Sequence, residues 1–457
     1  MANYTVQTPC GALQGAACQW PGVAAYRGIR YATAGRWEYP QPVTHWDGVY
    51  DATAYGACCY QTRAFSDEAK GNSFYYNEFR KGEQYTYSED CLFLNVWTPE
   101  NAAPGDRLPV LFYIHGGAFM GGCGHEKHFD GPVWPTKGVI GVTINYRLGP
   151  LGFACLPELA EEAGHTGNYG LYDQLAALEW VRANIEAFGG DPEKITIMGQ
   201  SAGAMSVQQL CLSPLAQGKF AGAVMSSGGG IGEFSRAPTA ENCYGFWQTV
   251  TQHTGCGDLA ALRALPVEKL FGAFFGAMSG QRAQGLPAVP VIDGAFIPRA
   301  PADTAAAGGQ AHVPYLIGST SHDMMPPMLL QMSREWSLLQ ARQGGPAAYT
   351  WHFDRMLPGD DAGAWHSSDL WYWFGTLDHC WRPFTEKDRA LSGQMVDYLT
   401  NFVKTGDPNG AGLPVWVPNA EGQNEVLRIG EGETRMGDVD IARLEEIMRT
   451  NKAEGER

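Results

Sequence analysis

The sequence is poor in positive charge, with 32 Lys and Arg against 48 Asp and Glu, a formal net charge of −16. Such a field repels phosphate backbones and anionic membrane surfaces, so we expect no nucleic-acid partner. Apolar runs of about 18 residues, the length that spans a membrane, are also missing. The N-terminus has neither the basic start nor the apolar stretch of a signal peptide. These absences predict a cytoplasmic protein with no membrane span.

Paired cysteine motifs are absent as well. Eleven cysteines are spread from Cys10 to Cys380 with no C-x-x-C, and an odd number without regular spacing does not suggest a disulfide framework. We expect mostly free thiols in a reducing compartment. The nearest metal-like spacing is His125-x-x-His128, which lies in a Gly-rich loop without a matching cluster. The sequence therefore predicts no metal and no organic cofactor.

What the sequence does contain is an alternation of short β-rich runs with helical ones between about residues 93 and 228. The expected strands are Phe93–Trp97, Val110–Ile114, Val139–Asn145, Ile195–Met198 and Ala223–Ser226. Between the third and fourth, an apolar stripe repeats every three or four residues from Leu171 to Phe188 and predicts a helix with a polar far face. Apolar strands separated by such helices predict an α/β fold with a mostly parallel central sheet flanked by helices on both faces. A C-terminal amphipathic helix is expected from Ile441 to Met448.

The most informative motif is Gly199-Gln200-Ser201-Ala202-Gly203, which follows an expected strand and precedes a helix-compatible segment. A G-x-S-x-G run also occurs by chance, but between a strand and a helix it predicts a nucleophile elbow. The turn is so tight that the residues two before and two after the serine must lack bulk. Ser201 is therefore the candidate nucleophile. The Ala202 amide, at a helix N-terminus, is a candidate oxyanion donor.

A second motif, His115-Gly116-Gly117, directly follows the strand Val110–Ile114. Two glycines at a strand end let backbone N–H groups approach a ligand closely, which is the arrangement of an oxyanion hole. A glycine pair can equally be a plain turn, and His115 a packed side chain. Together with Ser201, the motif predicts Gly116 and Gly117 as oxyanion donors.

With these motifs the chain resembles the type-B carboxylesterases, the cholinesterase-like branch of the α/β-hydrolase fold. The resemblance is carried by residues 188–203 and by Glu89 to Pro99, which fit the two signatures of that family. It extends over most of the chain, through AYRGIRYA, NYRLGPLGF, GNYGLYDQ, PVIDGAFIP and NFVKTGDPN. It implies one domain over residues 1–457, with insertions near 59–91 and 231–290 that cover the active site.

The same resemblance supplies the rest of the catalytic machinery. Residues 363–370 resemble the family's G-x-x-H-x-x-E-L segment, which makes His366 the expected base. In the segment from Gly318, Asp323 stands where the family has its catalytic Glu, and Asp369 is the alternative acid. The expected reaction is hydrolysis of a small-molecule carboxylic ester through an acyl-enzyme on Ser201.

Departures from the family bear on the substrate. Gln200 stands where relatives commonly have Glu, and residues 60–88 contain no Trp, so a choline-type cation is disfavoured. Aromatic side chains are dense in residues 60–88 and just after His366. Plain core packing accounts for such density equally well. We expect esters with apolar or aromatic groups and the following substrate contacts: Phe119, Gln200, Trp371 and Phe374.

Other interpretations stay open at this point. A catalytically dead adhesion module is disfavoured because the serine, the histidine and an acid are all present. Amide, thioester or lactone cleavage, or acyl transfer, would share the acyl-enzyme chemistry. The resemblance also implies that Cys59 and Cys91 can pair, and we expect both to be reduced in the cell. The sequence does not predict an oligomeric state.

Overall fold

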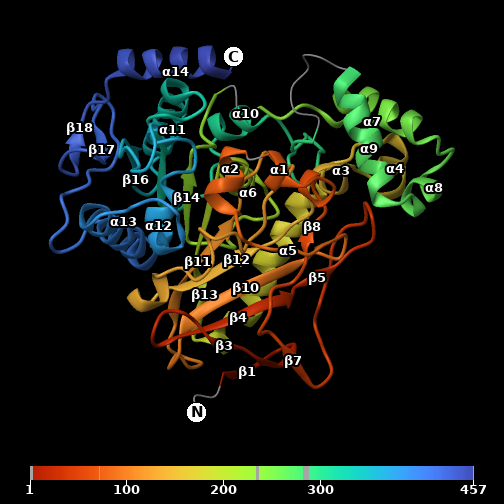
Figure 1. Cartoon of the computed structure of the whole chain (residues 1–457), viewed down its shortest axis with the longest axis horizontal. Coiled ribbons are helices and arrows are strands. Elements are labelled where there is room, and N and C mark those ends of the chain that lie inside the picture. The colour runs from red at the N-terminus through yellow and green to blue at the C-terminus, as the bar shows by residue number, and fades with distance from the viewer. Residues whose placement is uncertain (1–3, 72, 233–235, 281–287, 456–457) are drawn as a thin grey trace.

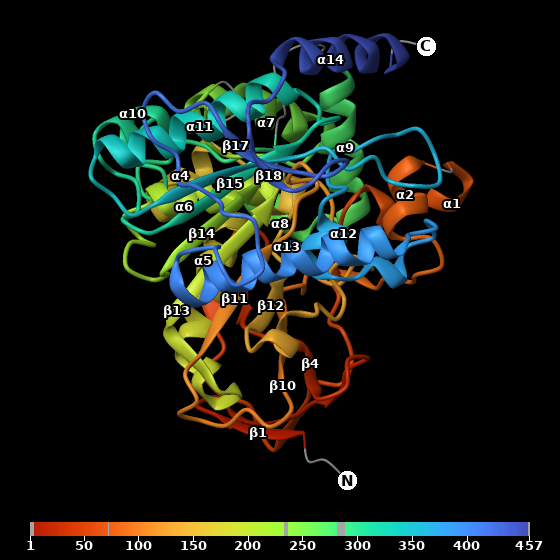
Figure 2. The same ribbon diagram turned by 90° about the vertical axis from the view of Figure 1, so that its left-hand side faces the viewer.

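A sheet of eleven strands runs through the middle of the molecule, and helices cover both of its faces (Figure 1, Figure 2). The computed structural model describes residues 4–71, 73–232, 236–280 and 288–455. The strands of this sheet are β3 (Ala16–Ala17), β4 (Val23–Arg30), β10 (Phe93–Pro99), β11 (Leu108–Ile114), β12 (Ile140–Ile144), β13 (Gly190–Gln200), β14 (Gly222–Ser226), β15 (Tyr315–Thr320), β16 (Ala348–Phe353), β17 (Val426–Ile429) and β18 (Arg435–Gly437). Their spatial order is β18-β17-β16-β15-β14-β13-β11-β12-β10-β4-β3.

The middle of the sheet is parallel. All neighbouring pairs from β12 through β11, β13, β14, β15 and β16 to β17 are parallel, while β10, β4, β3 and β18 form antiparallel edges. Side chains alternate between the two faces of a strand. Val110, Phe112 and Ile114 of β11 accordingly lie in one apolar core, and Leu111 and Tyr113 in the other. The predicted fold class, a mostly parallel sheet buried on both faces, is confirmed.

Helices on the two faces differ in their position along the chain. The longer ones packed around the sheet are α5 (Tyr169–Asn184), α6 (Ala202–Leu212), α11 (Pro326–Arg342), α13 (Glu386–Thr405) and α14 (Ile441–Gly455). Residues of α5 and α6 belong to the larger core, whereas α13 and the short α12 (Leu370–Phe374) close the opposite face. The predicted C-terminal helix is present, and it buries Leu444 and Ile447 against Leu330 of α11.

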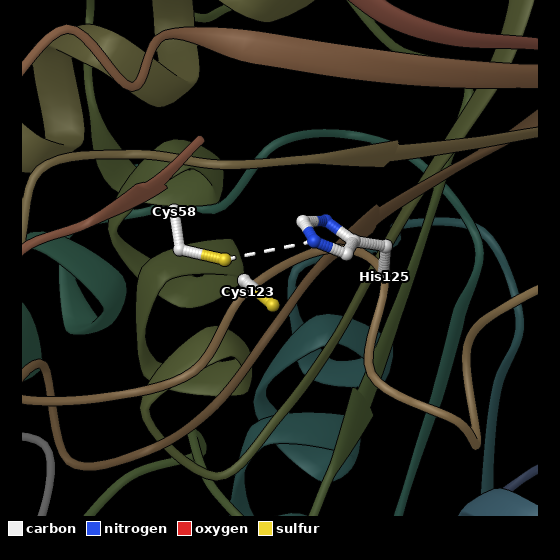
Figure 3. Close-up of side chains that lie close together, drawn as sticks. All are labelled: Cys58, Cys123 and His125. Carbon is white, nitrogen blue, oxygen red and sulfur yellow. Dashed lines mark hydrogen bonds between the residues drawn. The ribbon is translucent and has the colours of Figure 1, made fainter. Parts of the chain in front are cut away.

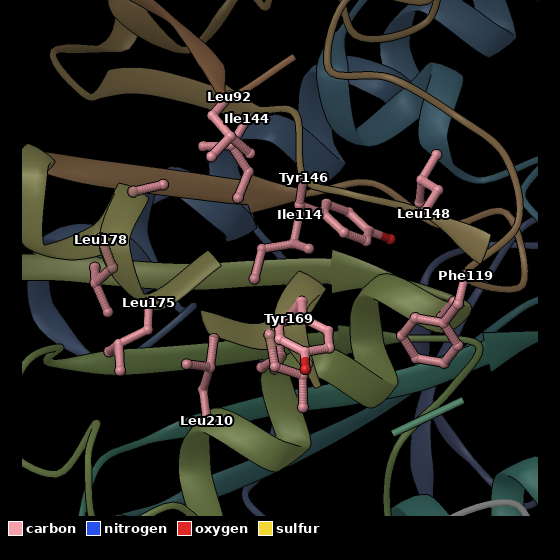
Figure 4. Packing of buried hydrophobic residues seen from close by; sticks show 14 of the residues in the cluster. Leu92, Ile114, Phe119, Ile144, Tyr146, Leu148, Tyr169, Leu175, Leu178 and Leu210 are labelled. Carbon is pink, nitrogen blue, oxygen red and sulfur yellow. The ribbon is translucent and has the colours of Figure 1, made fainter. Parts of the chain in front are cut away.

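The helix α5 departs from its predicted amphipathic pattern. Leu175 and Leu178 pack in the larger core near Ile114 and Ile144, as the stripe predicts (Figure 4). Its other side is buried too: Asp173 accepts hydrogen bonds from the Arg147 guanidinium at 2.7 and 2.8 Å. Gln174 likewise donates to Ser206 Oγ at 3.0 Å. The polar groups of this far face are therefore buried as well, and buried partners satisfy their hydrogen bonds.

Two excursions leave the sheet close to the predicted insertions. We call residues 59–91 the cover segment; it holds η1 (Thr62–Ala64), α1 (Glu68–Gly71), α2 (Phe74–Phe79) and β9 (Tyr87–Ser88), which pairs with β8 (Cys58–Cys59). The second excursion holds α7 (Ala240–Thr254), α8 (Leu259–Ala264) and α9 (Val267–Gly280), and α7 packs against α9 (Figure 1). Within the described part of the chain, no helix is both long and apolar enough to cross a membrane.

The remaining elements are short. They are β1 (Thr5–Thr8), β2 (Gly11–Gln14), β5 (Ala32–Thr33), β6 (Gln41–Pro42), β7 (Val49–Asp51), η2 (Trp134–Lys137), α3 (Gly149–Gly152), α4 (Pro157–Ala163), η3 (Ile185–Phe188), α10 (Pro301–Ala306) and η5 (Leu377–His379). β1, β2 and β7 form a small sheet of their own near the N-terminus (Figure 1). The structure thus leaves the carboxyl ends of the central parallel strands as the place where loops from distant parts of the chain meet.

Candidate active site

Ser201 stands on a strained turn between β13, which ends at Gln200, and α6, which begins at Ala202. Its backbone has φ +56° and ψ −126°, a conformation that non-glycine residues rarely adopt. A Cβ added to Gly199 would lie 2.2 Å from the Gly203 carbonyl oxygen, and one added to Gly203 would lie 2.1 Å from that of Ile114. The glycines of the motif are therefore required by close backbone contacts, as a nucleophile elbow demands.

The imidazole of His366 is held by Asp323, three residues beyond the end of β15. Its Nδ1 lies 2.6 Å from Asp323 Oδ1. The carboxylate is 1% exposed and also accepts hydrogen bonds from the Thr320 hydroxyl at 3.0 Å and the Met324 amide at 2.9 Å. Asp323 is therefore an ordered acceptor that fixes the tautomer with the proton on Nδ1 and the lone pair on Nε2.

Burial and the Asp323–His366 pairing shift the pKa values of these two residues in opposite directions. Burial raises the pKa of Asp323, but the His366 charge and hydrogen bond outweigh it, so that pKa lies below its usual range. Burial lowers the pKa of His366, yet the Asp323 carboxylate outweighs it, so the net shift is upward. A buried carboxylate beside an imidazole with a raised pKa is the pairing that a general base uses to accept a proton.

Gln200 makes the remaining contact to the His366 ring. Its Nε2 lies 3.2 Å from His366 Nε2. Because Nδ1 donates to Asp323, the Gln200 amide donates to the Nε2 lone pair. Ser201 and His366 line the same cavity, and in this structure the amide, rather than the Ser201 hydroxyl, meets that lone pair. Gln200 is thus a direct neighbour of the proposed base.

The alternative acid, Asp369, lies in a different environment. Its Oδ2 accepts hydrogen bonds from Ser226 Oγ at 2.9 Å and from Trp373 Nε1 at 3.1 Å. Burial raises its pKa to about 6. No hydrogen bond joins it to His366 within the residues described, so the geometry favours Asp323 as the orienting acid.

The predicted oxyanion donors gather around the serine. A Cβ added to Gly116 would lie 3.0 Å from Ser201 Cβ and 2.6 Å from the Gln200 carbonyl oxygen, so this backbone passes directly beside the nucleophile. Gly117 has φ +108°, and a Cβ there would lie 2.1 Å from the Gly121 carbonyl oxygen. Among described residues, no protein acceptor is paired with the amides of Gly116, Gly117 or Ala202. Three N–H groups are thus available next to Ser201.

A cavity of about 470 Å³ opens over these groups. Ser201, His366, Gln200, Gly116 and Gly117 line it. The cover segment supplies a further eight lining residues: Gln61, Thr62, Arg63, Ser66, Glu68, Tyr75, Phe79 and Arg80. The described residues of 231–290 supply none of the lining side chains.

Charged side chains on the cavity wall are paired and balanced. The Arg63 guanidinium lies 2.5 Å from Glu126, and the Arg80 guanidinium 3.0 Å from Glu68 and 3.8 Å from Glu126. Burial raises the pKa of Glu126, but the two arginines outweigh it and hold that pKa at about 2. Two cations against two anions leave the cavity with no net charge from these residues.

Three of the four expected substrate contacts do not line the cavity. Phe119 is buried in the larger core, 5.0 Å from the Phe153 ring. Trp371 and Phe374 lie in the second core, where Phe374 contacts Trp134 with ring centroids 4.4 Å apart. The reason is that the chain enters α12 directly after Asp369, and α12 packs on α13 and turns its rings inward.

The aromatic walls come from elsewhere. Tyr75 and Phe79 of α2 line the cavity together with Phe129 and Met120. The aromatic density of residues 60–88 in the sequence indicates Tyr75 and Phe79 as wall residues. Phe129 carries no signal, because it lies in the loop between β11 and β12 and only the fold brings it here. His128 stacks 3.7 Å from Phe79, and burial lowers its pKa to about 3.

The thiols of Cys59 and Cys91, which the resemblance pairs, are both buried and lie next to each other. The neighbouring Cys59 thiol and burial raise the pKa of Cys91 well above its usual value. Cys59 Sγ also accepts a hydrogen bond from the Leu148 amide at 3.2 Å. Both are free thiols, one in β8 and the other in the loop before β10.

Known proteins resemble this chain in sequence and in fold. The Carboxylesterase family matches residues 2–337 and 324–449. Para-nitrobenzyl esterase of Bacillus subtilis is 39% identical over 329 aligned positions, which cover 70% of this chain and 63% of that protein. Phenmedipham hydrolase of Pseudarthrobacter oxydans is 31% identical over 511 aligned positions, 96% of this chain and 97% of that protein. The solved structure of a thermophilic PNB esterase superposes with a TM-score of 0.83 at 28% identity, covering 97% of this chain and all of that one.

Proposed function

The chain belongs to the carboxylesterase family of ester hydrolases, and we propose that it cleaves neutral carboxylic esters through an acyl-enzyme on Ser201. The observation that carries the proposal is the 2.6 Å contact between His366 Nδ1 and Asp323 Oδ1 in the same cavity as Ser201. A serine, an imidazole and a buried carboxylate in that relation form a hydrolytic triad on many folds.

The proton follows one path through the reaction. The Gln200 amide first releases its hydrogen bond to His366 Nε2. The Ser201 hydroxyl then attacks the ester carbonyl carbon while His366 Nε2 takes its proton. Asp323 keeps the Nδ1 proton in place and stabilises the positive ring. The ring then protonates the leaving alcohol, and a water molecule repeats the sequence to release the acid and restore Ser201.

Negative charge develops on the substrate oxygen during each attack. The amides of Gly116, Gly117 and Ala202, which lack a protein acceptor among the described residues, are our proposed donors to it. The loss of one such donor typically costs about 3–4 kcal/mol of transition-state stabilisation. Every proton in the cycle moves among serine, imidazole, alcohol and water.

Cavity chemistry supports a neutral substrate with an apolar or aromatic group. Tyr75, Phe79, Phe129 and Met120 offer apolar surface, and the arginines of the wall are each neutralised by a glutamate. A cationic choline-type group would find no excess negative charge there. Apolar contacts of this kind discriminate between substrates by about 1–3 kcal/mol for each methylene.

The proposed function is tested with p-nitrophenyl acetate, butyrate and benzoate, together with matched thioester and anilide substrates. We expect ester turnover to exceed amide turnover, with kcat/KM rising from acetate to the larger groups. Ser201→Ala should lower kcat by about 10⁶-fold, the loss seen when a triad nucleophile is removed. Equal rates for all acyl groups would contradict the substrate preference, and turnover retained by Ser201→Ala would contradict the mechanism.

The location also stays a proposal. We propose a reducing, cytoplasmic compartment, supported by the odd number of cysteines and the lack of regular spacing among them. Peptide mapping of rapidly alkylated protein under non-reducing conditions tests it. Free thiols at Cys59 and Cys91 in protein taken directly from its native cells would agree, and a Cys59–Cys91 disulfide would contradict it.

A further inference from the structure

Two cysteines and a histidine converge beside residues 115–125, the loop after β11 that carries Gly116 and Gly117 and that we call the oxyanion loop. Cys58 belongs to β8, and Cys123 and His125 follow Gly122 in the loop after β11 (Figure 3). Their ligand atoms all lie within 4.8 Å of one another, and Cys58 Sγ is 3.6 Å from His125 Nε2. None of the three lines the catalytic cavity, so the cluster is separate from the proposed triad.

These distances suit a tetrahedral metal ion. With Zn–S bonds of about 2.3 Å, Zn–N bonds of about 2.05 Å and tetrahedral angles, a sulfur and a nitrogen ligand lie about 3.6 Å apart. Two sulfur ligands of the same ion lie about 3.8 Å apart. The observed 3.6 Å between Cys58 Sγ and His125 Nε2 matches the first value. The two sulfurs lie no more than 4.8 Å apart. They therefore need to approach by at most about 1 Å to reach the sulfur–sulfur distance of a tetrahedral site.

The backbone around the cluster is already tied together. Asn145 accepts a hydrogen bond from the Gly124 amide at 2.8 Å and donates to the Ala57 carbonyl oxygen at 2.9 Å. It thereby joins the residues directly beside Cys58, Cys123 and His125. A site whose ligands are held in place before the metal arrives loses less conformational freedom on binding.

The ligand side chains themselves are ordered. Both sulfurs are buried, and the His125 ring stacks on Tyr55 with centroids 4.4 Å apart and planes at 6°. The Cys123 sulfur lies within 4.8 Å of both the Cys58 sulfur and the His125 ligand nitrogen. A thiolate is the form of cysteine that binds metals.

A buried oxygen beside the cluster provides a second, independent observation. The hydroxyl of Tyr85 is inaccessible to solvent and has no hydrogen-bond partner in the described part of the chain. The Tyr85 ring also lies against the His125 ring, with centroids 5.6 Å apart. Buried hydroxyls normally have a partner. A water molecule in the fourth coordination position of an ion held by three protein ligands would provide one.

We propose that Cys58, Cys123 and His125 bind one Zn²⁺ ion, with a water molecule near Tyr85 in the fourth position. Two thiolates, one neutral imidazole and water suit zinc, and two thiolates balance its charge. The ion fastens β8 to the oxyanion loop, which Gln61 already clamps through Gly122 at 2.9 and 3.0 Å. The three ligands lie off the catalytic cavity, so the ion takes no part in the ester chemistry.

The test uses full-length protein reduced with a phosphine and stripped with a chelator. Zn²⁺ is then titrated against a chromophoric zinc chelator, with thermal melting in parallel, and Co²⁺ is added to a separate sample. We expect one equivalent of zinc to bind and the melting temperature to rise with zinc concentration. The cobalt form should show thiolate charge-transfer bands and the intense visible bands of a tetrahedral ion.

Substitutions locate the site. Cys58→Ser, Cys123→Ser and His125→Gln should each weaken zinc binding by more than the ~10–100-fold that loss of an outer-shell partner costs. Cys155→Ser is the matched control, because Cys155 is a buried cysteine beside Cys243 and outside the cluster; it should bind zinc as the wild type does. Circular dichroism checks that each variant folds. If a variant does not fold, the cobalt spectrum of the wild type still tests whether thiolates bind the ion.

Three outcomes would overturn the proposal. The first is reduced wild-type protein that binds no zinc. The second is zinc binding that survives the three substitutions or is lost equally in Cys155→Ser. The third is a cobalt form without thiolate charge transfer, which would leave the cluster as a hydrogen-bonded thiol pair beside a histidine. Ester turnover is a separate readout, since the proposed hydrolysis does not depend on the ion.

Discussion

The catalytic side chains and the segment that covers them are held in the molecule by different means. Ser201 directly follows β13, Asp323 lies three residues beyond the end of β15, and Gly116 lies two residues beyond the end of β11, all three being strands of the parallel sheet. Continuous backbone pairing runs from β11 through β13 and β14 to β15. The positions of Ser201, Asp323 and Gly116 are therefore set by main-chain hydrogen bonds and by close glycine contacts, which side-chain substitutions elsewhere barely change.

The cover segment, by contrast, is fastened by side chains. Glu78 of α2 pairs with Arg382 at 2.7 Å, and Arg382 also reaches Asp360 at 2.7 Å. Arg80 and Arg63 hold the cavity side through Glu68 and Glu126. Chemistry and substrate choice are therefore separable in this protein. The sheet positions the catalytic groups, whereas ion pairs and aromatic side chains shape the part of the cavity that contacts the substrate.

The largest effect that sharpens this comparison is expected at Asp323. Asp323→Asn should lower kcat by about 10⁴-fold for every ester, because the amide favours the wrong imidazole tautomer. Asp369→Asn should stay within about 10-fold of the wild type, since its carboxylate contacts Ser226 and Trp373 rather than His366. Steady-state kinetics of both variants decide the matter, and the reverse order would make Asp369 the acid.

Next in size is the oxyanion loop. Gly117→Ala should lower kcat by about 10²–10³-fold, because a Cβ would lie 2.1 Å from the Gly121 carbonyl oxygen and displace an amide donor. Gly138→Ala is the matched control: it also has positive φ, +75°, but a Cβ there meets nothing within 4 Å. That variant should lose about 1 kcal/mol of stability and keep its kcat. Equal losses of kcat in Gly117→Ala and Gly138→Ala would contradict the assignment of the Gly117 amide as an oxyanion donor.

A smaller, selective effect is expected in the cover segment. Tyr75 is 40% exposed and lines the cavity, so Tyr75→Ala can be made without opening the core. It should lower kcat/KM for benzoyl esters by about 2–10-fold, the worth of one aromatic contact, and change acetyl esters less. Phe74→Ala, on the same helix but off the cavity wall, should leave the ratio unchanged. A uniform loss for both esters would mean that Tyr75 does not select substrate.

The smallest change concerns pH. The raised pKa of His366 means that activity is lost as the pH falls through it, since the ring must be neutral to take the Ser201 proton. Gln200→Glu places a carboxylate next to Nε2, so the acidic limb of kcat/KM should move upward by about one unit, with alkaline rates little changed. A limb that moves downward or stays in place would show that Gln200 does not face the base.

Sequence patterns predict the catalytic groups at the sheet well and the side chains around them poorly. The elbow is local: Gly199, Ser201 and Gly203 lie within five residues, and the strand before them follows from its apolar run. The direction of Trp371 and Phe374 is not local, because it depends on how α12 packs against α13. Phe129 and the cluster of Cys58 with Cys123 depend on loops that meet across 65 residues or more, which no periodicity encodes.

In the proposed mechanism Ser201 alone carries the acyl group, and covalent labelling identifies this residue directly. Protein is treated with a sulfonyl fluoride or an organophosphate, residual esterase activity is followed, and peptides are mapped by mass spectrometry. The account predicts one adduct per chain, on Ser201, formed in step with the loss of activity and missing from Ser201→Ala. Inactivation with the label on another residue, or full inactivation with Ser201 unmodified, would contradict it.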